Sequence, residues 1–477
     1  MRTRRYLASA GVTLWLLAEL TLRCTAQQIN PMPGVENTVG YLSSGTSIEP
    51  KTTSESSAMI HRSLGSWTFM FHANAFLVDI QQNGPRGANK LFSTNWLMPA
   101  FYRQFGKQSL SVRTMLSLEP ATITKRRYPL LFQTGETAYG LSIVDGQHPH
   151  NFFMELAARY DFKLSERSQL FVYGGPVGDA ALGPTAFPHR ASSSENPLAP
   201  IGHHMQDATH IASDVITVGG VEGPVQLEVS AFQGREPGEN RWSIRGGKPD
   251  SFSGRITLAP YKTVSAQFST GRIKNPEALD PALDTMRMTA SIHHDLQLSS
   301  GHLSSSLIWG RNEDLKNGAR RIFNSYNLEI TSKFLRRNWV WTRIENVDRD
   351  RSLLPVETQT GPVCRLCGVV GFGTSLEDTA ESRQSLHRIL GPNGVPVTIE
   401  EEPIGRIQAY TVGYERTLAF PAVPSWMSSG IGLQVTMYSL PPHLVKIYGT
   451  HPATVAMFLR LRPTGNMSEH MKSMHHQ

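Results

Sequence analysis

Histidines that could bind a metal ion gather in one part of the chain. Six of the seventeen histidines lie between residues 148 and 210, in the segments DGQHPHNFF and AFPHRASSSENPLAPIGHHMQDATHI. Neutral imidazole nitrogens bind zinc, copper or nickel, particularly with a carboxylate nearby. The HxH and HH spacings cannot close a tetrahedral site alone, so the two segments would have to meet in space. The candidate ligands are His148, His150, His189, His203, His204, His210 and Asp207. The alternative is that these side chains only hydrogen-bond the backbone of folded loops.

A second group of potential ligands lies at the C-terminus, in the segment GNMSEHMKSMHHQ. Its members are Met467, His470, Met471, Met474, His475 and His476. Thioether sulfur together with imidazole nitrogen favours copper, and copper(I) prefers the softer sulfur. A tail of this kind could capture an ion and hand it over. The alternative is a polar tail without a function in metal binding.

The elements that must position these residues have the period of β-strands. Residues 66–80, SWTFMFHANAFLVDI, alternate between two faces, as a half-buried strand does. We count about sixteen such segments, within a range of 14 to 18. They are 66–80, 91–105, 108–119, 150–163, 168–176, 209–221, 223–233, 250–260, 262–273, 283–297, 302–312, 322–334, 337–348, 404–420, 428–440 and 451–462.

The connections between these segments alternate in length, and this alternation selects an architecture. Tight links follow the even-numbered segments. Long links follow most odd-numbered ones, at 120–149, 177–208, 234–249, 274–282, 313–321 and 349–403. Short periplasmic turns and long external loops are typical of an outer-membrane barrel, and an even strand number closes the sheet. The sequence therefore predicts an all-β fold, a transmembrane antiparallel β-barrel.

The barrel is expected over residues 61–462, with shorter segments on either side. Residues 1–26 have a basic start, an apolar core and small residues before Ala26, which predicts a secretory signal peptide. Residues 27–60 are polar and are predicted to form a flexible N-terminal segment, and 463–477 form the His/Met-rich tail. The pair Cys364 and Cys367 is predicted to form a small disulfide or to remain as two free thiols.

Composition excludes several classes of protein. Three cysteines in 477 residues rule out a disulfide scaffold, and the 18% of charged residues rules out a coiled coil. Beyond residue 30 no apolar run is long enough for a membrane-spanning helix. No segment resembles a nucleic-acid-binding module. We expect some of the tryptophans near strand ends to join an aromatic girdle, among Trp67, Trp96, Trp339, Trp341 and Trp426.

The histidine-containing stretch also carries a family resemblance. The run from DGQHPHNFFMELAARYDF through YGGPVGDAALGPTAFPHRASSSENPLAPIGHHMQDATHI resembles a family of uncharacterised bacterial exported proteins. The resemblance covers residues 60–275 and continues more loosely beyond them. It implies an outer-membrane β-barrel, often with His/Met-rich ends and associated with the handling of copper and other heavy metals. It implies no catalytic residue. The family's rich stretch is often N-terminal, whereas in this chain it is C-terminal.

These observations lead to three functional hypotheses. The first is an exported, non-enzymatic outer-membrane barrel that is either a porin-like channel for small solutes or a surface protein that handles metal, copper in particular. It would contact outer-membrane lipid, require no cofactor and bind copper or zinc. By analogy with sixteen-stranded porins, a homotrimer is the assembly to test. The alternatives are a soluble periplasmic or secreted β-rich metalloenzyme with a histidine centre, and a structural or adhesive surface barrel.

Overall fold

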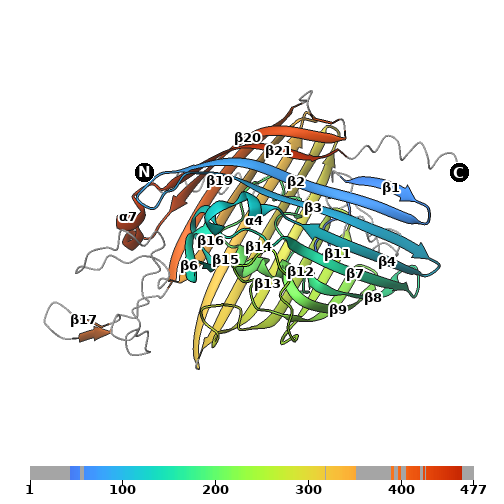
Figure 1. Cartoon of the computed structure of the whole chain (residues 1–477), viewed down its shortest axis with the longest axis horizontal. Coiled ribbons are helices and arrows are strands. Elements are labelled where there is room, and N and C mark those ends of the chain that lie inside the picture. Colours follow the sequence, from blue (N-terminus) through green and yellow to red (C-terminus); the bar gives the residue numbers. More distant parts are fainter. Residues whose placement is uncertain are drawn as a thin grey trace.

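The fold is a closed wall of antiparallel strands, seen from the side in Figure 1. The structure is a computed structural model. It describes residues 43–53, 59–316, 318–350, 388–390, 396–398, 404–418, 423–424 and 426–464. In this part of the chain no helix is long and apolar enough to cross a membrane.

Sixteen strands form the wall. They are β2 (Trp67–Gln82), β3 (Lys90–Phe105), β4 (Gln108–Leu116), β7 (Phe153–Lys163), β8 (Ser168–Gly178), β9 (Ala212–Glu222), β10 (Val225–Gln233), β11 (Ser251–Tyr261), β12 (Val264–Lys274), β13 (Asp284–Leu298), β14 (Gly301–Lys316), β15 (Ala319–Phe334), β16 (Asn338–Asp350), β19 (Ile404–Leu418), β20 (Met427–Ser439) and β21 (Ala453–Pro463). Each strand pairs with its neighbour along the chain. The first and last close the barrel, with register from Ala75↔Leu461 to Gln82↔Thr454. The short strand β1 (Ile60–Leu64) pairs with the start of β2.

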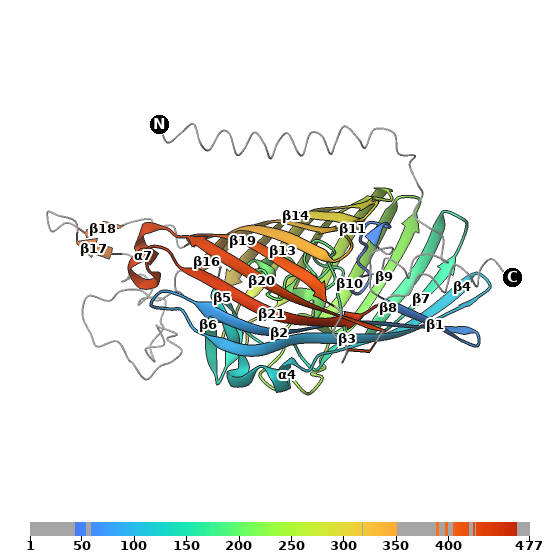
Figure 2. The same cartoon turned by 90° about the horizontal axis from the view of Figure 1, so that it is seen from above.

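The remaining elements are not strands of the wall. They are the hairpin β5 (Tyr128–Ala138) and β6 (Leu141–Gln147), the separate pair β17 (Arg388–Leu390) and β18 (Pro396–Thr398), α4 (Glu119–Thr122), η2 (Thr124–Arg126), α5 (His203–Gln206), η3 (Ala208–His210) and α7 (Pro442–Tyr448). Figure 2 shows α7 and the β5–β6 hairpin at one end of the barrel, which we call the loop end. The tight turns lie at the opposite end, the turn end.

The predicted barrel is confirmed, and all sixteen predicted segments are wall strands. One predicted long loop is wrong. Residues 313–316 belong to β14 and residues 319–321 to β15, which stay paired as far as Lys316↔Ala319, because alternation continues through this charged stretch. Strands β1, β5, β6, β17 and β18 were not predicted. The predicted signal peptide and the cysteine pair lie outside the described residues, and so does the tail from residue 465 onward.

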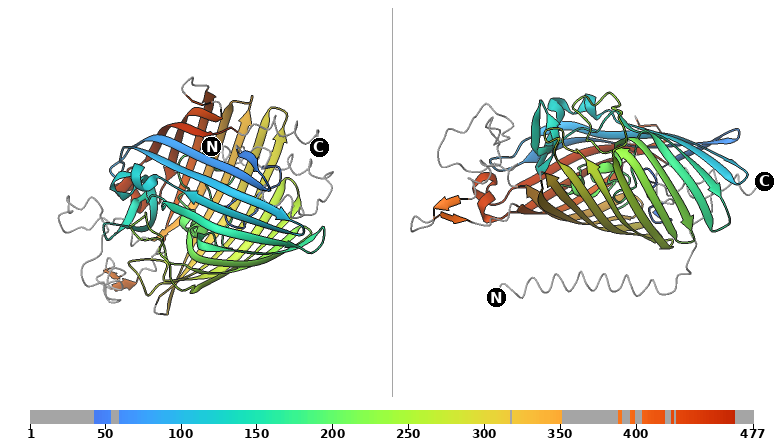
Figure 3. Two further views of the ribbon diagram at one scale, coloured as in Figure 1. Left: turned by 45° about the vertical axis from the view of Figure 1, so that its right-hand side comes forward. Right: turned by 90° about the horizontal axis from the view of Figure 1, so that it is seen from below.

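The two faces of the wall differ as a membrane barrel requires. Outward side chains are apolar and exposed, as at Val218, Leu227 and Val229, whose exposed fractions are 51%, 57% and 63%. Their inward neighbours Thr217 and Glu228 are buried. Figure 3 shows the ribbon of the wall from two further sides. The same division of exposed apolar and buried polar side chains continues around the wall. A closed barrel satisfies every strand's backbone hydrogen bonds, and its apolar exterior suits lipid. The protein is therefore an outer-membrane-type barrel, located in the outer membrane.

The tryptophans depart from the expected girdle. Trp96, Trp339 and Trp341 are at most 8% exposed, because their register points them into the lumen. There the Trp341 Nε1–H donates to Gln434 Oε1 at 3.0 Å. Trp426 is 51% exposed, and outward tyrosines such as Tyr326 supply further aromatic surface.

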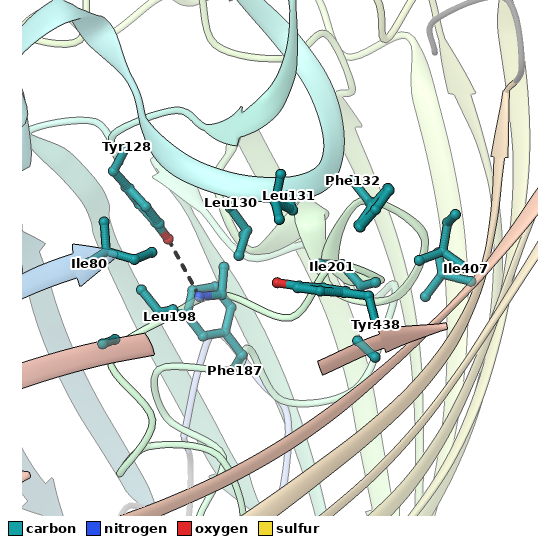
Figure 4. Packing of buried hydrophobic residues seen from close by; sticks show 14 of the residues in the cluster. Ile80, Tyr128, Leu130, Leu131, Phe132, Phe187, Leu198, Ile201, Ile407 and Tyr438 are labelled. Carbon is teal, nitrogen blue, oxygen red and sulfur yellow. Dashed lines mark hydrogen bonds between the residues drawn. The ribbon is translucent and has the colours of Figure 1, made fainter. Parts of the chain in front are cut away.

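Three segments occupy the lumen. The β8–β9 connection, residues 179–211, is called the inner loop; every residue from 179 to 210 is buried or half-buried. The β5–β6 hairpin packs against it through an apolar cluster, in which Tyr128, Leu131 and Phe132 meet inner-loop and wall residues (Figure 4). The long connections 120–149 and 177–208 thus fold into the barrel mouth.

The third segment is residues 43–53, called the lumen strap. Residues 44–50 are buried, so this part of 27–60 differs from the flexible segment that we expected. Its small polar residues fit between wall and inner loop. The Arg113 Nη2–H donates to the Gly45 carbonyl at 2.7 Å, and Gln226 Nε2–H donates to the Thr46 carbonyl at 3.0 Å. The small side chains at Gly45 and Thr46 allow the wall to reach the backbone carbonyls of this segment.

Buried ion pairs fasten the inner loop to the wall. Arg190 donates from Nε to Glu329 Oε2 at 2.7 Å, and Glu329 also accepts from Arg343 at 3.0 Å. Arg460 of β21 pairs with both Glu195 of the inner loop and Glu415 of β19. Charges buried in this way are tolerable only when they are paired and hydrogen-bonded. The inner loop is therefore a fixed part of the barrel interior.

Candidate functional site

The predicted histidines come together inside the loop-end half of the lumen. His148 and His150 directly follow β6, and His203 and His204 form the first turn of α5. His210 ends η3, just before β9 enters the wall. The folding of the inner loop into the barrel brings two segments together that are more than fifty residues apart in sequence. The condition set by the sequence, that both segments must meet, is satisfied.

The imidazole rings are close neighbours. Ring centroids are 5.6 Å apart for His150 and His210 and 5.2 Å for His203 and His210. They are 5.1 Å apart for His203 and His204, and 5.4 Å for His148 and His204. Five of the six histidines predicted in this region thus form one group, which we call the histidine cluster.

Carboxylates orient the rings. The Nδ1–H of His150 donates to Glu119 Oε2 at 3.0 Å, and that of His203 donates to Asp207 Oδ1 at 2.5 Å. His148 Nε2 lies 3.0 Å from Glu136 Oε1. A ring whose Nδ1 donates to an oxygen keeps its lone pair at Nε2, the arrangement by which proteins orient metal-binding histidines.

His150 and His210 each have one ring nitrogen without a hydrogen-bond partner. His210 Nδ1–H donates to the Asp207 carbonyl at 2.7 Å, so this ring, like that of His150, directs Nδ1 to an oxygen. The Nε2 atoms of both rings are buried and have no hydrogen-bond partner. His204 Nδ1 and Glu236 Oε2 are buried and make no hydrogen bond, although His204 Nδ1 lies 3.5 Å from Glu236 Oε1. An unpaired buried polar atom is costly, so four of them in one place indicate room for a ligand or for water.

These four atoms belong to residues that line one cavity, which we call the histidine cavity. Its volume is about 40 Å³, and its lining also includes Arg241 and Arg287. This is enough for an ion with one or two waters, since a single water needs roughly 10–15 Å³. A second cavity of about 220 Å³ shares part of this lining, including Gln233 and Glu236, and is closed by the β10–β11 connection. The wider cavity therefore adjoins the histidine cavity directly.

Burial keeps most of the cluster neutral. It lowers the pKa of His203 to about 3 and the pKa values of His204 and His210 to about 4. Burial also acts to lower the pKa of His150, but the adjacent Glu119 carboxylate outweighs it and the net pKa is raised. Burial and the charge of Glu136 raise the pKa of Glu236 to about 8. At neutral pH the inner-loop rings therefore present lone pairs rather than positive charge.

The side chains of the histidine cluster do not already have the geometry of a metal-binding site. Within the described part of the chain, no three histidine, cysteine or acidic side chains already converge as a metal-binding group. Two imidazoles bound to one tetrahedral ion at about 2.0 Å per bond place their ring centroids about 5 Å apart. The 5.6 Å between His150 and His210 is close to that value. Small ring rotations would be needed for both Nε2 atoms to reach one ion.

The other predicted ligands lie elsewhere. Asp207 does not face the cavity as a free ligand, since it accepts from His203 and from Arg190 at 3.0 Å. His189 lies apart from the cluster, with its ring 4.6 Å from that of Trp96. The six tail residues Met467, His470, Met471, Met474, His475 and His476 lie outside the described residues, and their role stays a prediction.

The carboxylates around the cluster were not predicted. Glu119 and Glu136 precede His148 by 29 and 12 residues, and Glu236 lies on a different connection. The signal that could have found them is a glutamate in or directly beside a predicted long loop that also contains apolar residues, as in LEPATI and QTGETAYG. Such a carboxylate must be paired if the loop is buried.

Among three comparisons with known proteins, the comparison with solved structures found matches. No family model matches the chain, and no curated protein matches its sequence. An anion-selective porin from Comamonas acidovorans has 12% identity and a TM-score of 0.44, covering 83% of this chain and 99% of its own. The outer-membrane channel DcaP of Acinetobacter baumannii has 11% identity and a TM-score of 0.42, covering 84% and 99%. Pseudomonas putida OprB has 9% identity and a TM-score of 0.44, covering 83% and 94%. The barrel assignment for this chain rests on its own strand pairing.

Proposed function

We propose that this outer-membrane barrel is a narrow, porin-like channel for metal ions that binds a borderline transition-metal cation, copper(II) or zinc, in the histidine cavity. The observation that carries the proposal is the set of unpartnered buried atoms there. The Nε2 atoms of His150 and His210 line the same cavity without a hydrogen-bond partner. His210 presents a lone pair there, and His150, whose pKa is raised, would present one by releasing a proton when the cation binds. Imidazole nitrogen with nearby carboxylate is a donor set for zinc and copper.

The occupied lumen favours an ion over a larger solute. The inner loop, the β5–β6 hairpin and the lumen strap are buried against the wall over most of their length. A solute the size of a sugar would have to displace one of them, together with ion pairs such as Arg190–Glu329. A single cation needs only the volume that the histidine cavity and its wider neighbour already offer.

The exterior weighs against a soluble enzyme. Side chains such as Leu227 and Val229 would expose an apolar belt to water, which soluble proteins avoid. The absence of enzymatic activity stays a prediction. The adhesive alternative depends on the connection 349–403, most of which lies outside the described residues.

The test is metal binding by the purified barrel in detergent. To remove the competing tail ligands, we use the full-length chain with Met467, Met471 and Met474 changed to Leu and His470, His475 and His476 changed to Gln. We call it the tail-silenced chain. Its affinity for Zn²⁺ is measured by competition with a chromophoric chelator. His150→Gln and His210→Gln, singly and together, remove the proposed ligands, and His451→Gln, in the β20–β21 connection, is the matched control.

We expect each single change at the cavity to weaken zinc binding at least tenfold, because one of two imidazoles is lost. His451→Gln should leave the affinity unchanged, since this exposed residue does not line the cavity. In liposomes that contain a zinc-sensitive dye, the double variant should slow zinc entry. Equal zinc affinity of the double variant and the tail-silenced chain would overturn the binding site. A gel mobility shift on boiling checks that each variant is folded.

A further inference from the structure

Sulfur-containing side chains gather at one place on the lumen wall. Met98 of β3, Met115 of β4 and Met154 of β7 form a buried cluster with Trp96, and each of the four is at most 8% exposed. Other parts of the inward face are polar, as at Ser269 of β12 and Thr289 of β13, or aromatic and aliphatic, as at Phe458 of β21. The three methionines on adjacent strands distinguish this part of the wall by their sulfur atoms.

One histidine contacts this cluster from the inside of the barrel. His189 of the inner loop places its Nε2 atom 3.1 Å from Met115 Sδ. The His189 ring is 4.6 Å from that of Trp96, and the ring of His72, on β2, lies 6.4 Å from that of His189. A nitrogen donor and a thioether thus lie side by side against an aromatic face.

The backbone of His189 is held on two sides. Its amide donates to the Ala186 carbonyl at 2.9 Å within a turn of the inner loop. Its own carbonyl accepts from Ser43 Oγ of the lumen strap at 3.0 Å. Met115 is fixed in β4, which pairs with β7 on one side. The nitrogen–sulfur pair is therefore positioned by the wall, the inner loop and the strap together.

We propose that His189 and Met115, with Met98 and Met154 as neighbouring thioethers, form a binding site for a soft monovalent cation, copper(I) or silver(I). Thioether sulfur selects such ions, and imidazole nitrogen is a compatible second ligand. With the bond lengths of zinc sites, about 2.0 Å to nitrogen and 2.3 Å to sulfur, a tetrahedral ion would hold the two donor atoms about 3.5 Å apart. The observed 3.1 Å is shorter, so the two side chains would move apart slightly to bind an ion. The face of Trp96 adds attraction for a cation.

This site is distinct from the histidine cavity and does not rest on the function proposed for it. The two sites differ in their donor atoms. The His189–Met115 site offers sulfur with nitrogen, and the histidine cavity offers nitrogen with carboxylate oxygen. A small cavity lined by Trp96, His150 and Phe187 lies between the two. Either site could bind its ion if the other did not.

The experiment measures affinity for Ag⁺, a redox-inert probe, and for Cu⁺ under anaerobic reducing conditions, in the folded tail-silenced chain. Met115→Leu preserves the volume and removes the sulfur, and His189→Gln removes the nitrogen. The matched control is Met457→Leu, because Met457 is 51% exposed on the outer face of β21. We expect the first two changes to weaken Ag⁺ binding at least tenfold and Met457→Leu to have no effect.

Two further measurements separate the sites and protect the test against misfolding. His150→Gln should leave Ag⁺ affinity unchanged while weakening Zn²⁺, so failure of one proposal is distinguishable from failure of the other. X-ray absorption of Cu⁺ bound to the tail-silenced chain should show sulfur neighbours at about 2.3 Å. Unchanged Ag⁺ affinity in folded Met115→Leu would overturn the proposal, and so would a copper spectrum with nitrogen and oxygen neighbours only.

Discussion

Replacement of Arg190 by methionine should detach the inner loop from the barrel wall. The Arg190 side chain is fully buried and makes four contacts. It donates to both Glu329 carboxylate oxygens at 2.7 and 3.1 Å, to Asp207 Oδ2 at 3.0 Å and to the Thr185 carbonyl at 2.7 Å. Methionine retains most of the volume and removes every donor.

The expected loss in free energy of unfolding depends on which carboxylates still have a partner after the change. Removal of one partner of a buried ion pair typically costs 3–5 kcal/mol. Glu329 would keep its contact with Arg343 at 3.0 Å, and Asp207 would keep His203 at 2.5 Å. We therefore expect the lower limit, about 3 kcal/mol, for Arg190→Met. With a denaturant slope of about 3 kcal/mol/M in urea, the unfolding midpoint should fall by about 1 M.

The assay is urea unfolding of the detergent-solubilised barrel, followed by tryptophan fluorescence and by gel mobility. Arg272→Met is the matched control, because Arg272 pairs with Asp284 at 2.6 Å but its side chain is 62% exposed. An exposed pair contributes at most about 1 kcal/mol, which shifts the midpoint by less than about 0.3 M. If both variants shift the midpoint equally, the inner loop is not held by this buried network and the reasoning is refuted.

Three further changes probe the contents of the lumen. Gly45→Val should displace the lumen strap and so raise single-channel conductance. Gly45 has a φ of +52°, and an added Cβ would lie 2.5 Å from Asp179 Cβ. Unchanged conductance would count against a strap that blocks the lumen. Gly310→Val should destabilise the barrel by about 1–3 kcal/mol in urea unfolding and expose the inner loop to protease, because its Cβ would lie 2.3 Å from the Met205 carbonyl. The folded barrel should lose stability as the pH falls from 6.5 to 4, because burial lowers the pKa values of His204 and His210 to about 4 and the unfolded chain binds protons first. The raised pKa of His150 acts in the opposite sense. Changing both His204 and His210 to Gln should make the unfolding midpoint depend less on pH across this range.

The wall of the barrel was predictable because its determinants are local. Alternation along a segment such as 223–233 fixes which side chains face lipid, and the length of each connection fixes the end of the barrel at which it lies. Neither property requires knowledge of distant residues. The same locality explains the failure at 313–321, where charged residues at strand ends look like a loop although the hairpin pairing continues through them.

The candidate sites could be predicted only in part. Residue type identified His150 and His210 as potential ligands, and the sequence set the condition that their two segments must meet. It could not identify Glu119 as the carboxylate that fixes the tautomer of His150, because this pairing depends on how the 117–152 connection folds. It also passed over Met115, since a methionine in an alternating strand is indistinguishable from wall packing.

The strand pattern, the apolar exterior and the kinds of donor atom available inside follow from local properties of the sequence. The contents of the lumen depend on contacts between distant parts of the folded chain. Arg190 and Glu329 are 139 residues apart in sequence, and Arg113 and Gly45 are 68 residues apart. Contacts over such separations have no periodic signature in the sequence. The buried inner loop and lumen strap bring His189 to Met115 and His150 to His210, because polar groups enclosed in a barrel must find partners wherever the chain places them.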